Sequence, residues 1–136
     1  MAEIILATHG KMASGVADAL KLLVGVNPSL HLLEAYNDNE AIEQKIDHLC
    51  AQLDLQQQWI FVCDLPYGSV AQALAIRFMK TPDQVKLLCG FNLGLILRLT
   101  SLRQAVFSDD QLRDLIQESR QDLVLLSDLF QPSSDF

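Results

Sequence analysis

Two residues with chemically useful side chains, His9 and Asp64, each stand at the end of a short apolar run in this 136-residue chain. A carboxylate that hydrogen-bonds one imidazole nitrogen fixes the tautomer and leaves the other nitrogen with a lone pair for nucleophilic attack. It also stabilises the cation that forms when that nitrogen bonds to an electrophile. If the fold brings the two residues together, His9 could carry a phosphoryl group while Asp64 orients its ring.

Four further residues beside this pair are candidates for binding phosphate or a partner protein: Gly10, Lys11, Gly68 and Ser69. Gly10 lets another backbone approach the imidazole, and Lys11 could steer an anion. A helix that begins near Ser69 would offer free N–H groups and a positive dipole end, and Gly68 would let an anion come close to them. Simpler interpretations remain for several of these residues. Lys11 could be a solvated charge, Ser69 a helix cap and residues 66–68 a turn. Asp64 could simply end a strand.

The elements that must position these residues alternate regularly along the chain. Apolar runs predict strands at residues 3–8, 30–35, 59–63 and 85–89. Helical patterns predict helices over 14–24 with Ser14 as N-cap, from 37 or 38, from 69, after an Asn92 cap, and after a Ser108 cap. This βαβαβαβαα order predicts a single domain over residues 1–136: a doubly wound, mainly parallel α/β sheet with helices on both faces.

Residues 59–63 are apolar at every position, which indicates a strand buried on both faces. With strand order 2-1-3-4, the first and third strands are neighbours whose outgoing helices lie on opposite faces. Ligands bind in the crevice at such a switch point, so His9 and Asp64 should face each other there. The segment 122–126 has two possible states: an extension of the last helix, or a fifth edge strand that pairs within the chain or with another subunit.

Composition excludes several classes of function. The net charge of -7 argues against nucleic-acid binding, and no run approaches the ~20 apolar residues of a membrane span. Because the sequence starts directly with a strand, we expect no signal peptide and a cytoplasmic protein. The three cysteines form no CxxC pair, and we expect no metal and no cofactor. His31 and His48 are expected to be structural or surface residues.

Three segments resemble the IIA domain of the mannose-type family of the bacterial phosphoenolpyruvate:sugar phosphotransferase system. They are ILATHGKMASG at 5–15, FVCDL at 61–65 followed by Gly68-Ser69, and GFNL at 90–93. The resemblance implies a cytoplasmic phosphotransferase component whose His9 accepts a phosphoryl group from phospho-HPr on Nε2 and passes it to a IIB component. It further implies that Asp64 holds the other ring nitrogen, and that the protein is a homodimer with an exchanged C-terminal strand.

One loop departs from the family pattern. The family usually has Gly-Gly-Ser/Thr-Pro after the aspartate, whereas Tyr67 and Val70 replace the first glycine and the proline here. Two alternatives therefore stay open. A regulatory relative would have lost transfer, whereas a small α/β enzyme with a His9/Asp64 dyad would need a deeper pocket.

Overall fold

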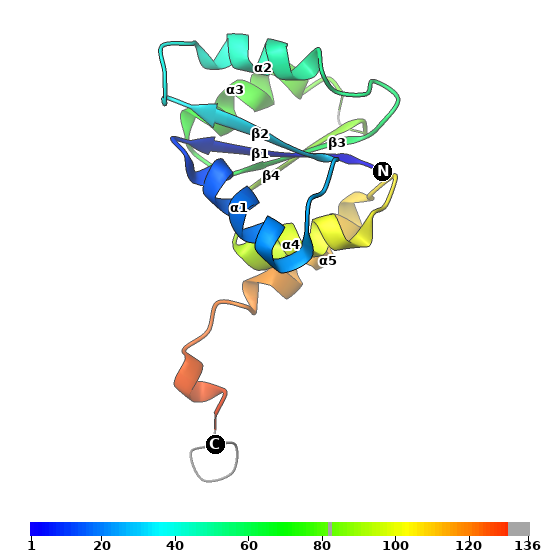
Figure 1. The fold of residues 1–136 in the computed structure, drawn as a ribbon. Helices are drawn as coiled ribbons and strands as arrows, with labels where there is room; N and C mark the ends of the chain where they lie inside the picture. Colours follow the sequence, from blue (N-terminus) through cyan, green and yellow to red (C-terminus); the bar gives the residue numbers. More distant parts are fainter. Residues whose placement is uncertain (82, 131–136) are drawn as a thin grey trace.

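A single four-stranded sheet organises the chain in a computed structural model, which describes residues 1–81 and 83–130 (Figure 1). All neighbouring strands are parallel, and their order is β2-β1-β3-β4. The strands are β1 (Glu3–His9), β2 (Leu30–Ala35), β3 (Trp59–Cys63) and β4 (Val85–Cys89). The helices are α1 (Met12–Val24), α2 (Ile42–Cys50), α3 (Ser69–Phe78), α4 (Leu93–Leu102) and α5 (Asp109–Arg120). The fold class and strand order predicted from the sequence are confirmed.

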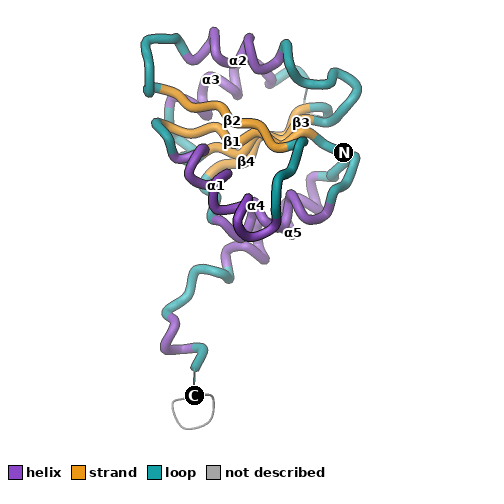
Figure 2. Tube along the Cα trace, viewed as in Figure 1, coloured by secondary structure: helices purple, strands orange, loops and turns teal. Residues whose placement is uncertain are grey.

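Helices cover both faces of this sheet. Helices α2 and α3 pack on one face, and α1, α4 and α5 pack on the other (Figure 2). Side chains of β1 alternate between the two layers: Ile5 joins the first core, whereas Ile4 and Leu6 join the second. Every residue of β3 is buried, as its uniformly apolar sequence predicts.

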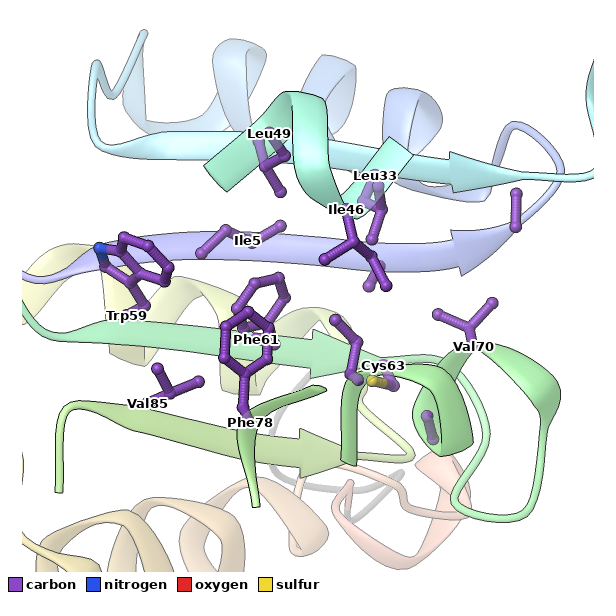
Figure 3. Close-up of a cluster of buried hydrophobic side chains, with 14 of the residues drawn as sticks. Ile5, Leu33, Ile46, Leu49, Trp59, Phe61, Cys63, Val70, Phe78 and Val85 are labelled. Atoms are coloured by element: carbon purple, nitrogen blue, oxygen red, sulfur yellow. The ribbon is translucent and has the colours of Figure 1, made fainter. Parts of the chain in front are cut away.

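The first core consists of side chains that interlock between β1, β3 and the helices α2 and α3. Figure 3 shows Phe61 of β3 against Phe78 of α3, whose ring centroids lie 5.2 Å apart. Val70, in the first turn of α3, is completely buried in this cluster. This burial fixes the start of α3 against the carboxyl end of β3, which is where the candidate site lies.

Two predicted helix starts are wrong, and hydrogen bonds explain both. Helix α1 begins at Met12 rather than Ser14, because the buried Thr8 hydroxyl already accepts the backbone N–H of Ala13, at 3.0 Å. Helix α2 begins at Ile42 rather than near 37, because the Asp38 carboxylate accepts the N–H of Glu40 in a turn. The start of α3 at Ser69 and the caps at Asn92 and Ser108 are confirmed.

The C-terminal segment is neither the helix extension nor the strand considered from the sequence. Helix α5 ends at Arg120, and the chain continues through a 3₁₀ turn at Leu126–Asp128. Figure 1 shows this segment leaving the body of the molecule. Five aliphatic side chains of this segment are exposed, and so is Phe130. The five are Leu123, Val124, Leu125, Leu126 and Leu129. Within the described residues, the sheet therefore has no fifth strand. Within residues 1–81 and 83–130, no helix is long and apolar enough to cross a membrane.

Candidate functional site

The last residue of β1, His9, stands at the carboxyl edge of the sheet. The next residue, Gly10, has a φ of 61°, and its N–H donates to the carbonyl of Ala35 at the end of β2, at 2.7 Å. This left-handed conformation favours glycine and turns the chain sharply from the strand into α1. The imidazole therefore remains at the rim, where its side chain is 36% exposed.

Asp64 holds His9 through one carboxylate oxygen. Asp64 follows β3 directly, and its Oδ2 lies 2.9 Å from Nδ1 of His9 and 2.8 Å from the backbone nitrogen of the same residue. Its Oδ1 accepts the N–H of Leu65 at 3.0 Å. The sequence-based expectation that topology brings His9 and Asp64 together is met by this geometry.

The electrostatics of Asp64 favour an ionised carboxylate. Burial raises the pKa of Asp64, but hydrogen bonds from the backbone and ring of His9 outweigh burial, so the pKa falls below its ordinary value of 3.8. At neutral pH Asp64 is therefore an acceptor only, and the bond to Nδ1 requires the proton to be on Nδ1. The neutral imidazole then keeps its lone pair on Nε2, which makes no hydrogen bond with any described residue.

The backbone at Gly68 borders the edge of the ring that carries Cε1 and Nε2. A Cβ atom added to Gly68 would lie 3.0 Å from Cε1 of His9 and 3.7 Å from Nε2. Gly68 is the N-cap of α3 and has an extended conformation with no side chain to cap the helix. The positive end of the α3 dipole thus lies next to Nε2, in a position suited to an anion.

An aromatic residue, Tyr36, also contacts the site, although the sequence analysis did not identify it. Its ring stacks on His9 with centroids 5.5 Å apart and an angle of 24° between planes. Its hydroxyl lies 2.6 Å from the Oγ of Ser69. In the sequence, the only available signal is its position: Tyr36 follows the second strand, at the same sheet edge as His9.

The other residues considered from the sequence contribute less directly. Lys11 is exposed at the N-cap of α1, and Asn92 caps α4 while its amide donates to the carbonyl of Ser119. His31 and His48 lie away from the site and pair with Glu3 and Glu40. Among the described residues, no group of three or more His, Cys, Asp or Glu side chains could hold a metal ion.

The thiol next to Asp64 is poorly suited to chemistry. Cys63 is completely buried and lies in register with Cys89 on β4. Burial raises the pKa of both thiols, which disfavours the thiolate forms. Compared with these thiols, the Nε2 atom of His9 is the better candidate for a nucleophile.

Residues 3–118 match a family model described as the PTS system fructose IIA component, where PTS denotes the phosphotransferase system. The chain belongs to this IIA family. Among proteins with curated functions, none matches the chain.

Solved structures share the fold of this IIA chain. A putative phosphoenolpyruvate-dependent sugar PTS permease from Klebsiella pneumoniae is 26% identical, with a TM-score of 0.79 over 92% of this chain and 90% of that one. A PTS IIA protein associated with the fucose utilization operon of Streptococcus pneumoniae is 23% identical, with a TM-score of 0.74 over 96% and 100%. A mannose/sorbose specific IIA subunit from Enterococcus faecalis is 21% identical, with a TM-score of 0.69 over 91% and 93%. The last two likenesses establish the fold only, whereas the family match supports a component of a sugar phosphotransferase system.

Proposed function

We propose that this IIA chain is a cytoplasmic phosphocarrier that accepts a phosphoryl group from phospho-HPr on His9 and passes it to a IIB component. The observation that carries the proposal is the geometry of the ring: Asp64 holds Nδ1 at 2.9 Å, while Nε2 faces the dipole end of α3. In the transfer, the lone pair of Nε2 forms a bond to phosphorus as the donor's nitrogen–phosphorus bond breaks. The proton stays on Nδ1, and the carboxylate stabilises the positive ring.

Gly10, Lys11, Gly68 and Ser69 have supporting roles in this proposal. Gly68 and Ser69 bring the α3 N-terminus to the phosphoryl oxygens, and Lys11 attracts the anionic donor group across the exposed rim. Gly10 has no side chain that would cover His9, so that a partner protein can reach the imidazole. Both partners must contact the same imidazole in turn, so an open site suits a carrier.

The shape of the surface favours transfer between proteins over turnover of a small substrate. Among the cavities of the described surface, four have volumes of about 300 to 470 Å³, and His9 lines none of these four. A dyad hydrolase would need a pocket that buries most of its substrate. The exposed imidazole instead fits a reaction in which the partner protein supplies the second half of the site.

The decisive experiment is incubation of the protein with phosphoenolpyruvate, enzyme I and HPr, followed by intact mass and an acid-lability assay. We expect one acid-labile, base-stable phosphate per chain, and none in His9→Ala, whose circular dichroism should be unchanged. A phosphate that persists in His9→Ala would exclude His9 as the carrier. No uptake by the native protein, with the partners active on a control IIA protein, would favour a regulatory relative.

We further infer a homodimer from the C-terminal segment and the sheet edge. Leu123, Leu125 and Leu126 are 85%, 69% and 59% exposed, and the strand at the end of the sheet, β4, can accept another strand. Insertion of this segment beside β4 of a second copy would bury these leucines. Light scattering should therefore report a dimer for the full chain and a monomer for a chain that ends at Asp122. A full chain that is monomeric at high concentration would contradict the exchange.

A further inference from the structure

Tyr36 has a backbone conformation that needs an explanation. Its φ is 66°, and only one other non-glycine residue of the described chain, Arg103, has a positive φ. A bulky side chain is disfavoured in this left-handed region, and such strain is found where the surrounding structure needs a particular side-chain position. Core packing does not account for it, because Tyr36 is 60% exposed.

The strained backbone places Tyr36 over His9. Its neighbour Ala35 pairs in register with His9 and accepts the N–H of Gly10, at 2.7 Å. Tyr36 is thus the first residue after the paired part of β1 and β2. Its backbone is left-handed, and its own ring stacks on the imidazole of His9. Asp64 holds the ring at Nδ1, Gly68 borders its Cε1 edge, and Tyr36 covers one of its faces.

The hydroxyl of Tyr36 contacts the residue most suited to bind a phosphoryl oxygen. Tyr36 Oη lies 2.6 Å from Ser69 Oγ, and Ser69 follows the glycine that borders Nε2. A serine hydroxyl has one proton to donate and can accept at the same time. If the tyrosine donates to Ser69 Oγ, the serine proton is free to donate to a phosphoryl oxygen, and each bond polarises the next.

We propose that Tyr36 is a positioning residue for phosphoryl transfer: its stacked ring fixes the plane of His9, and its hydroxyl orients Ser69 toward the phosphoryl group. This inference rests on the proposed function, because it requires a phosphoryl group on Nε2. Tyr36 itself bonds to no reacting atom. Its two contributions can be separated, because Tyr36→Phe keeps the ring and removes only the hydroxyl.

The test is a double-mutant cycle with Tyr36→Phe, Ser69→Ala and the double variant, measured with two phosphoryl donors. Phospho-HPr tests the proposed reaction, and phosphoramidate is a small donor that needs no partner protein. If Tyr36 acts through Ser69, each single variant slows phosphorylation of His9 about 3- to 10-fold, as expected for one lost hydrogen bond. The double variant is then no slower than Ser69→Ala, because both changes remove the same contact.

Three controls isolate the effect. Ser101→Ala removes a hydroxyl from exposed Ser101 on α4 and should leave the rate unchanged. The ring-proton signals of His9 in nuclear magnetic resonance should keep their ring-current shift in Tyr36→Phe and lose it in Tyr36→Ala. Tyr36→Ala should then be slower than Tyr36→Phe, with the change in kcat rather than in KM for phospho-HPr.

The two donors separate failure of this inference from failure of the proposed function. Native rates in Tyr36→Phe, or losses that add in the double variant, would overturn the role of Tyr36 while His9 remains a carrier. Phosphorylation by phosphoramidate but not by phospho-HPr would refute the carrier function, and the phosphoramidate rates of the cycle would still decide the role of Tyr36. No phosphate on His9 from either donor would contradict both.

Discussion

The Asp64 Oδ2 atom accepts two hydrogen bonds from one residue, the ring Nδ1–H and the backbone N–H of His9, at 2.9 and 2.8 Å. The backbone bond fixes where the carboxylate lies, and the ring bond fixes the tautomer. Because both donors belong to His9, the imidazole cannot turn about its own side-chain bonds without losing the ring bond. Two adjacent strands thereby set both the position and the protonation pattern of a single imidazole.

Asp64→Asn should slow phosphorylation of His9 by about 100-fold or more, the range of a lost proton-orienting group. The asparagine oxygen can still accept the backbone N–H, but its amide can donate to Nδ1. The ring proton would then move to Nε2 and block the attacking lone pair. Stopped-flow or quenched-flow transfer from phospho-HPr should show a lower kcat, whereas the dissociation constant for HPr, measured by titration, should change little. Equal transfer rates would mean that Asp64 is structural.

The same carboxylate predicts how stability depends on pH. Since the folded-state pKa of Asp64 lies below 3.8, its contribution is fully present above that value and is lost as the pH falls through the folded pKa. The difference in unfolding free energy between the native protein and Asp64→Asn should therefore still be present at about pH 5. It should shrink as the pH falls below 3.8.

Urea unfolding at a series of pH values measures this difference. Asp114→Asn, which removes an exposed carboxylate from α5, is the matched control and should show no comparable change. A difference that stays constant down to the lowest accessible pH would show that the bonds to His9 do not stabilise the ionised form of Asp64.

Tyr67 is the residue of the divergent loop that is best placed to contact a partner. It is 99% exposed, and it lies between Asp64 and the start of α3. Exposed tyrosines often provide a large part of the binding energy when a partner covers them. Tyr67→Gly should raise the dissociation constant for HPr or the IIB component about 5- to 30-fold, as expected for the loss of an aromatic contact.

Isothermal titration with each partner separates the two interfaces. Tyr67→Phe keeps the aromatic ring and should bind nearly as well as the native protein. If Tyr67→Gly binds both partners with native affinity, the loop does not take part in recognition.

The elements and the His9–Asp64 pair could be predicted from the sequence because they depend on topology. The apolar run before Asp64 predicts a buried strand, and parallel order then forces its carboxyl end beside that of β1. The contact of Tyr36 could not be predicted, because it depends on a left-handed backbone and on the register of Ala35 with His9. The start of α1 could not be predicted either, because the hydroxyl that accepts the N–H of Ala13 belongs to Thr8, inside the preceding strand.

Gly68→Ala should impair phosphorylation more than it impairs folding. The added methyl carbon would lie 3.0 Å from Cε1 of His9 and 3.5 Å from Cβ of Leu65, so the imidazole has to move. The φ of Gly68 is −83°, which alanine adopts without strain. We expect at least about a tenfold slower transfer, because small displacements of a reacting group have large effects on rate.

Gly15→Ala is the control for this substitution. Gly15 lies inside α1, and nothing stands within 4 Å of an added Cβ. Alanine should therefore stabilise the protein by about 0.5–1 kcal/mol and leave the transfer rate unchanged. Equal transfer rates in Gly68→Ala and Gly15→Ala would show that the imidazole tolerates displacement at its Cε1 edge.

The strain at Tyr36 can be measured by comparing two variants that both lack its ring. At a φ of 66°, alanine bears the left-handed penalty and glycine does not, so Tyr36→Gly should be more stable than Tyr36→Ala by about 1 kcal/mol. Exposed Leu22, inside α1, provides the opposite reference, because there alanine should be the more stable of the two by about 1 kcal/mol. Thermal or urea unfolding of the four variants gives both differences. If alanine is favoured at position 36 as it is at 22, the left-handed turn relaxes once the ring is gone, which would mean that the contacts with His9 and Ser69 hold the backbone in that conformation.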